Sequence, residues 1–148
     1  MNNDLSSYFE DPEFKEALEK YEGMVKNHTP AYCDADELTD IAEYYASKGR
    51  QIEAEAAIDF ALQLHPNDTD ALIFRARSLA MKGRLDEAYM VMDLIEDRSD
   101  REVRFLKADL LMEEKRMEEA DHVFEELAAY EEGKLETLID IILAYICL

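Results

Sequence analysis

The 148-residue chain has few of the residues that break regular structure, with four glycines, three prolines and no tryptophan. So few glycines leave no glycine-rich loop of the kind that cradles a phosphate group. Long β-branched runs are absent as well, whereas hydrophobic residues make up 48% of the chain and charged residues 35%. This composition argues against a disordered chain and favours a well-folded helical protein.

Cysteine is equally scarce. Cys33 and Cys147 lie near opposite ends of the sequence, so they form no CxxC pair, no disulfide framework and no pattern that resembles a zinc site. We therefore expect a reducing compartment. The stretch Met1–Glu10 is polar and acidic, unlike a secretory signal, and together these observations predict a cytoplasmic protein.

Basic residues are outnumbered, with 16 lysines and arginines against 36 aspartates and glutamates and a net charge of −20. A surface this acidic repels phosphate backbones and anionic membranes, so we expect neither nucleic acid nor a membrane as partner. Residues 69–100 are the least acidic part of the chain. Solubility is the simpler interpretation of the acidic excess, and an electrostatic preference for basic partners is the alternative.

Catalytic and metal-binding patterns are also missing. Glu119-x-x-His122 matches half of a carboxylate-bridged two-metal motif, but the chain has no second copy, and an exposed helix face explains it more simply. The segment 67–70 lacks the central glycine and distal glutamate of a calcium loop. We expect no catalysis, no metal and no cofactor. A small enzyme that uses Glu119 and His122 is the least favoured hypothesis.

What the sequence does contain is a pattern of small, large and glycine positions that occurs three times at nearly equal spacing. The three copies are Ala42, Tyr45, Gly49, Ala54, Ile58 and Ala61; Ala76, Leu79, Gly83, Ala88, Met92 and Ile95; and Ala108, Leu111, Lys115, Ala120, Phe124 and Leu127. A period of this length indicates a solenoid of stacked units. Small residues let two helices approach closely and large ones fill the space beside them. Lys115 replaces the glycine of the break, so we expect a less relaxed turn there.

Cap and turn residues divide the chain into helices. Asp34 with Glu37, and Ser99 with Glu102, resemble capping boxes. The expected helices cover about 12–26, 35–47, 51–64, 69–81, 85–97, 100–114, 117–129 and 134 to the end. The expected organisation is a flexible N-terminus (1–6), an N-terminal helix and turn (7–34), repeats at 35–68, 69–100 and 101–133, and a terminal helix (134–148) that begins an incomplete fourth repeat.

The repeat resembles the tetratricopeptide repeat family. The first-helix pattern of that family is matched by Leu38, Ile41, Ala42 and Tyr45 before the Gly49 turn, and the second-helix pattern by Ala54, Ile58 and Ala61 before Pro66. The resemblance covers about residues 35–148. It departs from the family where the usual tryptophan is replaced by Leu38, Leu72 and Arg104. The resemblance implies an all-α fold, a right-handed superhelix of helix hairpins, and a non-catalytic scaffold for protein–protein interaction.

In that family the concave surface comes mainly from the first helix of each hairpin. By register, the resemblance implies a groove lined by Asp36, Thr39, Glu43, Asp70, Ile73, Arg77, Met81, Glu102, Phe105, Asp109, Met112 and Glu113. Several of these side chains are apolar where a solvated face would be polar, which suits a peptide groove. The alternative is that later helices or the terminal helix cover them.

The family members that clamp a terminal carboxylate use lysine, asparagine and arginine on this face. The corresponding places here are occupied by Thr39, Glu43, Phe74, Glu102 and Leu106. A carboxylate would meet like charge at this surface, so we expect a protein or peptide partner with a basic or apolar segment.

The terminal helix is apolar on nearly every side. Its apolar run covers only positions 135–148 and is interrupted by Asp140, so it is too short for an ordinary membrane span. One side can pack on the third repeat, and a terminal repeat normally needs a polar outer face. Two explanations stay open, a homodimer or a fragment of a longer array. The residues predicted for self-association are Leu135, Leu138, Ile139, Ile142, Leu143 and Ile146.

Overall fold

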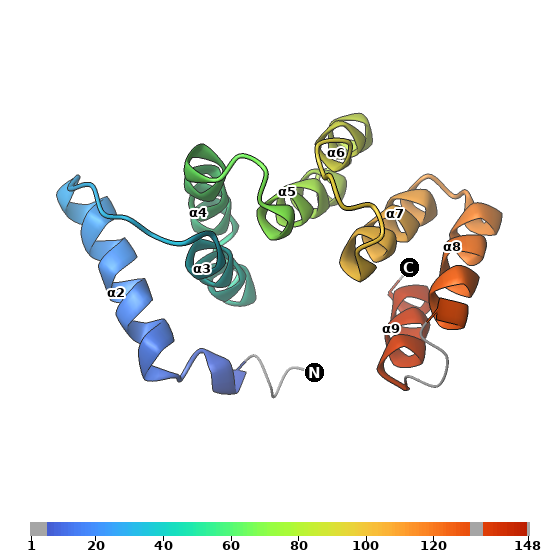
Figure 1. Ribbon diagram of the computed structural model, residues 1–148, viewed down its shortest axis with the longest axis horizontal. Helices are drawn as coiled ribbons and strands as arrows, with labels where there is room; N and C mark the ends of the chain where they lie inside the picture. The colour runs from blue at the N-terminus through green and yellow to red at the C-terminus, as the bar shows by residue number, and fades with distance from the viewer. Residues whose placement is uncertain (1–5, 131–134, 148) are drawn as a thin grey trace. The chain divides into compact units, whose positions relative to one another are not determined.

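A computed structural model describes residues 6–130 and 135–147, and the regular structure in these residues is helical (Figure 1). From residue 12 onward the helices are α2 (Pro12–Asn27), α3 (Ala35–Ser47), α4 (Gln51–Leu64), α5 (Thr69–Met81), α6 (Leu85–Met92), α7 (Arg101–Glu113), α8 (Met117–Tyr130) and α9 (Leu135–Ile146). The predicted all-α class is confirmed, and the right-handed superhelix stays a prediction. The predicted flexible N-terminus lies outside the described residues, except for Ser6.

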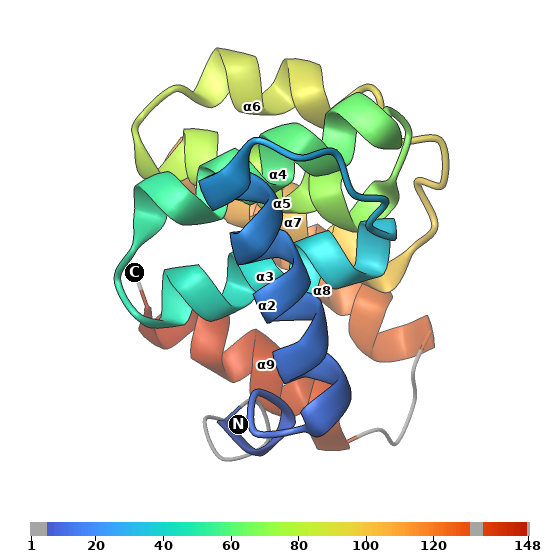
Figure 2. The ribbon, with the colours of Figure 1, turned by 90° about the vertical axis from the view of Figure 1, so that its left-hand side faces the viewer.

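The chain forms two compact units, Met1–Phe74 and Arg75–Leu148, and the boundary between them falls inside α5. In the first unit, α2 packs against α3, and α3 forms a hairpin with α4 (Figures 1 and 2). Two fully buried side chains, Leu38 of α3 and Ile58 of α4, belong to the core of this unit. The Tyr45 hydroxyl donates a hydrogen bond of 2.8 Å to Glu22 of α2. This bond joins the N-terminal helix to the hairpin.

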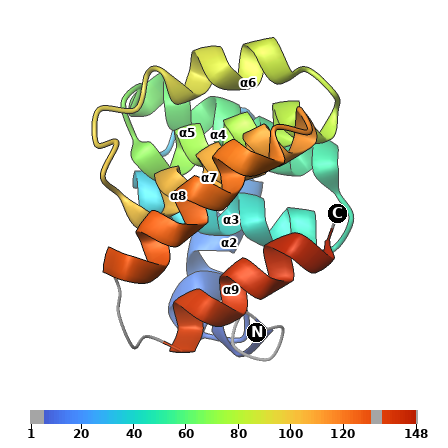
Figure 3. The ribbon, with the colours of Figure 1, turned by 90° about the vertical axis from the view of Figure 1, so that its right-hand side faces the viewer.

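In the second unit, α7 and α8 form a hairpin and α9 packs against it (Figure 3). The core between them contains Phe124 and Leu127 of α8, against which Ile141 and Ala144 of α9 pack. An arginine–carboxylate pair of 2.5 Å joins Arg101 of α7 to Asp140 of α9. The one aspartate that interrupts the apolar terminal helix is therefore paired.

The repeated small and large positions lie in the buried interior of the protein. All of them except the turn positions are buried: Ala42, Tyr45, Ala54, Ile58, Ala61, Ala76, Leu79, Ala88, Met92, Ile95, Ala108, Leu111, Ala120, Phe124 and Leu127. The alanines of this set are completely buried, as expected where two helices approach closely. The positions predicted to be buried are therefore buried, and their packing as a repeat stays a prediction.

The three hairpin turns have the same backbone geometry. Gly49, Gly83 and Lys115 have φ angles of 73°, 75° and 62°, in the left-handed region. The residue after each of them donates its backbone N–H to the carbonyl five residues earlier, at 2.9 Å in every case. This bond satisfies a carbonyl at the end of the first helix. Lys115 thus adopts a conformation that glycine adopts without strain, as the sequence predicts.

Replacing this lysine should stabilise the protein. A side chain in the left-handed region costs about 1–2 kcal/mol, and glycine costs about 0.5–1 kcal/mol in added freedom of the unfolded chain. We therefore expect Lys115→Gly to raise the free energy of unfolding by about 0.5–1 kcal/mol, measured by urea denaturation. Gly83→Lys should lower it by a similar amount. A loss of stability in Lys115→Gly would contradict the assigned turn geometry.

Each turn is followed by an arginine that pairs with a glutamate three residues on, a repeat that sequence analysis missed. The pairs are Arg50–Glu53 at 2.9 Å, Arg84–Glu87 at 2.5 Å and Arg116–Glu119 at 2.6 Å. They recur along the chain with the same spacing as the core positions. All three pairs are largely exposed, so each contributes about 1 kcal/mol or less.

Two predicted boundaries in the second unit need correction. Helix α6 ends at Met92, not near residue 97. In the segment that follows, the Arg98 guanidinium donates to the Ile95 carbonyl and to the Asp93 side chain, and these bonds stabilise a non-helical backbone there. The N-cap of α7 is Asp100, not Ser99. The Asp100 carboxylate accepts hydrogen bonds from the backbone of the first turn. The predicted capping box at Asp34 and Glu37 is present.

Candidate binding pocket

Five side chains of the predicted groove lie around one pocket in the second unit, which has a volume of about 280 Å³. Arg77 and Met81 come from α5, and Asp109, Met112 and Glu113 come from α7. Residues three or four apart lie on one face of a helix, which explains why each set lines the same side. The structure therefore brings these five residues together. Their binding of a partner stays a prediction.

The rest of the pocket is mostly apolar and was not predicted. Its other lining residues are Ala80, Leu106, Leu110, Ala144 and Cys147. Ala144 of α9 and Cys147, just after the end of that helix, bring the C-terminal part of the chain to the pocket. The spacing of Thr137, Ile141 and Ala144, at i, i+4 and i+7, is the signal that marks the packed face of α9. In a helix that is apolar on nearly every side, this signal is hidden among other apolar residues.

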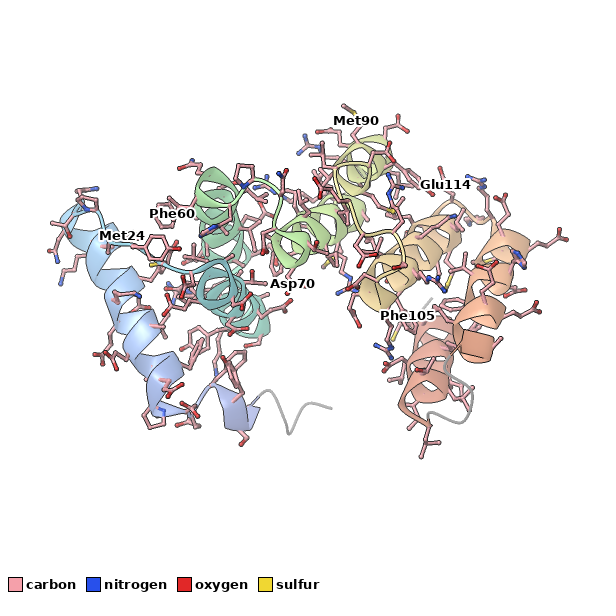
Figure 4. The ribbon with its side chains drawn as sticks, in the orientation of Figure 1. Met24, Phe60, Asp70, Met90, Phe105 and Glu114 are labelled. Carbon is pink, nitrogen blue, oxygen red and sulfur yellow. The ribbon has the colours of Figure 1, made fainter. Side chains whose placement is uncertain are left out.

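Phe105 does not line an open groove, which corrects the sequence prediction. Its side chain is buried in the core of the second unit, with its ring centroid 6.0 Å from that of Phe124 (Figure 4). The Arg101 guanidinium lies over the same ring, 4.8 Å from its centroid. Met112 is also buried, although it lines the pocket. Part of the predicted apolar groove therefore belongs to the core. This agrees with the alternative interpretation, in which other helices cover these side chains.

In the first unit, the predicted groove residues have different environments. Asp36, Glu43 and Asp70 are exposed. The Thr39 hydroxyl donates to a carbonyl one turn earlier in α3, at 2.9 Å. Ile73 is buried, so it is not available to a partner, and this part of the prediction is wrong.

The charges around the pocket favour a cation. Arg77 contacts Glu102, with 3.4 Å between Nη2 and Oε2, and Arg101 contacts the same carboxylate at 2.8 Å. Asp109 is half-buried, and its burial raises the pKa of the carboxyl group. Arg77 lowers this pKa, whereas the nearby carboxylates of Glu102 and Glu113 raise it further. The ionised form of Asp109 is therefore incompletely compensated, and an added positive charge would stabilise it.

The residues predicted for self-association form an exposed stripe on α9. Leu135, Leu138, Ile139, Ile142, Leu143 and Ile146 have exposed fractions between 42% and 71%. Leu135, Ile139, Ile142 and Ile146 follow the alternating four- and three-residue spacing of a helix seam. The opposite side of α9 packs on the core. These six residues form the α9 stripe.

The two residues considered for catalysis, Glu119 and His122, each contact a different side chain. Glu119 accepts hydrogen bonds from Arg116, whereas the ring of His122 lies 3.3 Å from Glu126. Among residues 6–130 and 135–147, no group of three or more histidine, cysteine, aspartate and glutamate side chains is placed to hold a metal ion. None of the helices in the described part of the chain is both long and apolar enough to cross a membrane.

Comparison of the chain with protein-family models, with curated proteins and with solved structures gives no match.

Proposed function

We propose that this protein is a non-catalytic interaction scaffold, built from tetratricopeptide-like hairpins, that binds a short peptide or a helix of a partner protein. The observation that carries the proposal is the pocket in the second unit. It collects five residues of the predicted groove around apolar walls. Ligand sites of this kind combine mostly apolar linings with a few polar groups that set orientation.

The rim of the pocket supports a peptide ligand. Met81 is 82% exposed although it is a large apolar side chain. Methionine is flexible and polarisable, so it adapts to apolar side chains of different shape. Glu113 is exposed on the same rim. A segment with an apolar residue and a basic residue would contact both.

A matched pair of methionine substitutions tests this function. Random peptides displayed on phage are selected on the immobilised chain, and affinities of the selected peptides are measured by fluorescence anisotropy. We expect Met81→Glu to weaken binding by about tenfold or more, as at other binding hot spots. Met90→Glu is the control, because Met90 is 69% exposed on α6 and points away from α7 (Figure 4).

Binding that is equally weak in both variants, or a selection that enriches no peptide, would remove the proposed function. Unfolding curves of the two variants establish that neither substitution acts through stability, because both side chains are exposed.

The α9 stripe favours a second function, self-association. An exposed apolar surface on a helix is typical of an interaction site, and the stripe contains no charged residue. Two copies of so acidic a chain repel each other less where the contact surface is uncharged. Sedimentation of the chain over a range of concentrations tests this function independently of the peptide selection.

A further inference from the structure

The pocket in the second unit has the chemistry of a site for an alkylammonium group. Its apolar walls include Leu106, Leu110 and Ala144, and its carboxylates are Asp109 and Glu113. An ammonium group on a chain of methylenes buries the methylenes against apolar residues and keeps its charge near a carboxylate. Groups of both kinds line the pocket, together with Arg77 and Cys147.

The charge balance selects a cation over an anion. Among the charged residues that line the pocket, the two carboxylates of Asp109 and Glu113 outnumber the one guanidinium of Arg77. Arg77 also contacts Glu102, a carboxylate that it shares with Arg101. An anionic ligand would approach these carboxylates in a chain of net charge −20. A cation meets attraction both at the pocket and in the field of the whole protein.

We propose that this pocket binds a lysine side chain of the partner, with the ammonium group beside Asp109 and the methylenes against Met81 and Ala144. The inference rests on the proposed function and names the residue that this site selects. Lysine fits better than arginine, because its stem is flexible and its charge is compact.

The proposal has a pH dependence with a defined direction. The charged groups that face Asp109 are Arg77 on α5 and Glu102 and Glu113 on α7, and the Cys147 thiol lines the pocket beyond the end of α9. Burial raises the pKa of Asp109 in the free protein, and a bound ammonium group lowers it. Affinity for the cation therefore falls as the pH is lowered through the pKa of Asp109, because the protonated carboxyl group no longer attracts the charge.

Three probes of equal length separate charge from apolar contact: hexylammonium, hexanol and hexanoate. Their affinities are measured by two-dimensional NMR from shifts at Ala80 and Ala144. We expect hexylammonium to bind about fivefold or more tightly than hexanol, and hexanoate to bind most weakly. Asp109→Asn should remove the advantage of hexylammonium over hexanol, and Glu113→Gln should reduce it.

The control is Asp86→Asn, an exposed position on α6 outside the pocket, which should leave the advantage unchanged. Equal binding of hexylammonium and hexanol, tightest binding of hexanoate, or no shifts at the pocket with any probe would each overturn the lysine site. Peptides without lysine that still lose affinity in Met81→Glu would leave the scaffold function in place while overturning this inference. The two proposals therefore fail separately.

Discussion

Ile58→Ala should destabilise the first unit by about 2–5 kcal/mol. Ile58 is completely buried on α4, in a core that includes Leu38 and Ile41 of α3. Removing three carbons there loses the transfer free energy of the buried groups and leaves a cavity that the surrounding helices fill only in part. The free energy of unfolding is measured by urea denaturation with far-ultraviolet circular dichroism.

The same helix provides a matched control. Ile52 is 83% exposed, so Ile52→Ala deletes the same atoms without opening a cavity, and we expect a change within about 0.5 kcal/mol. Similar losses in the two variants would mean that the two isoleucines do not differ in burial, and the packing register of α4 would then be wrong.

Ile142→Asp should weaken self-association by about a hundredfold or more. Ile142 lies in the middle of the α9 stripe and is 56% exposed, so the substitution should leave the folded monomer intact. In a dimer formed through the stripe, the new carboxylate would be buried without a partner, and burial of an unpaired charge is strongly unfavourable. Sedimentation equilibrium of the parent and the variant measures the difference.

Ile52→Asp places the same charge on an exposed position of α4 and should leave association unchanged. A parent chain that stays monomeric at the highest accessible concentration would eliminate the second function. Association that survives Ile142→Asp would locate the contact elsewhere.

The sequence predicts the helices and their buried faces well because both depend on local spacing. Ala54 and Ile58 share the buried face of α4, and their counterparts in the two later repeats are buried in the same way. The end of α6 is harder to predict from the sequence, because no glycine or proline follows the last helical residue. A side chain outside the helix, Arg98, bonds back to the carbonyl of Ile95.

The sequence predicts only some of the residues that line the pocket. It does not show that α9 reaches the pocket or which groove positions other helices cover. Phe105 and Met81 are both apolar residues at predicted groove positions, yet one is buried and the other is 82% exposed. The difference depends on which neighbouring helices cover each side chain, and register within a single helix contains no such information. The Asp140–Arg101 pair is equally hidden, because its two residues are far apart in the sequence.

Hydrogen bonds from tyrosine to carboxylate side chains connect neighbouring segments, and their loss in strong base should lower the stability of the fold. Tyr8 donates to Asp40 in the first unit, and Tyr89 donates to Glu114 in the second. The hydrogen bond to Asp40 raises the pKa of Tyr8 from 10 to about 12. Burial and the hydrogen bond to Glu114 raise the pKa of Tyr89 from 10 to about 12.

A phenol whose pKa is raised by folding contributes stability that is complete below pH 10 and is lost as the pH rises through 12. In alkali the deprotonated phenol no longer donates a hydrogen bond and faces a carboxylate of the same charge. We therefore expect each compact unit to lose stability at these positions.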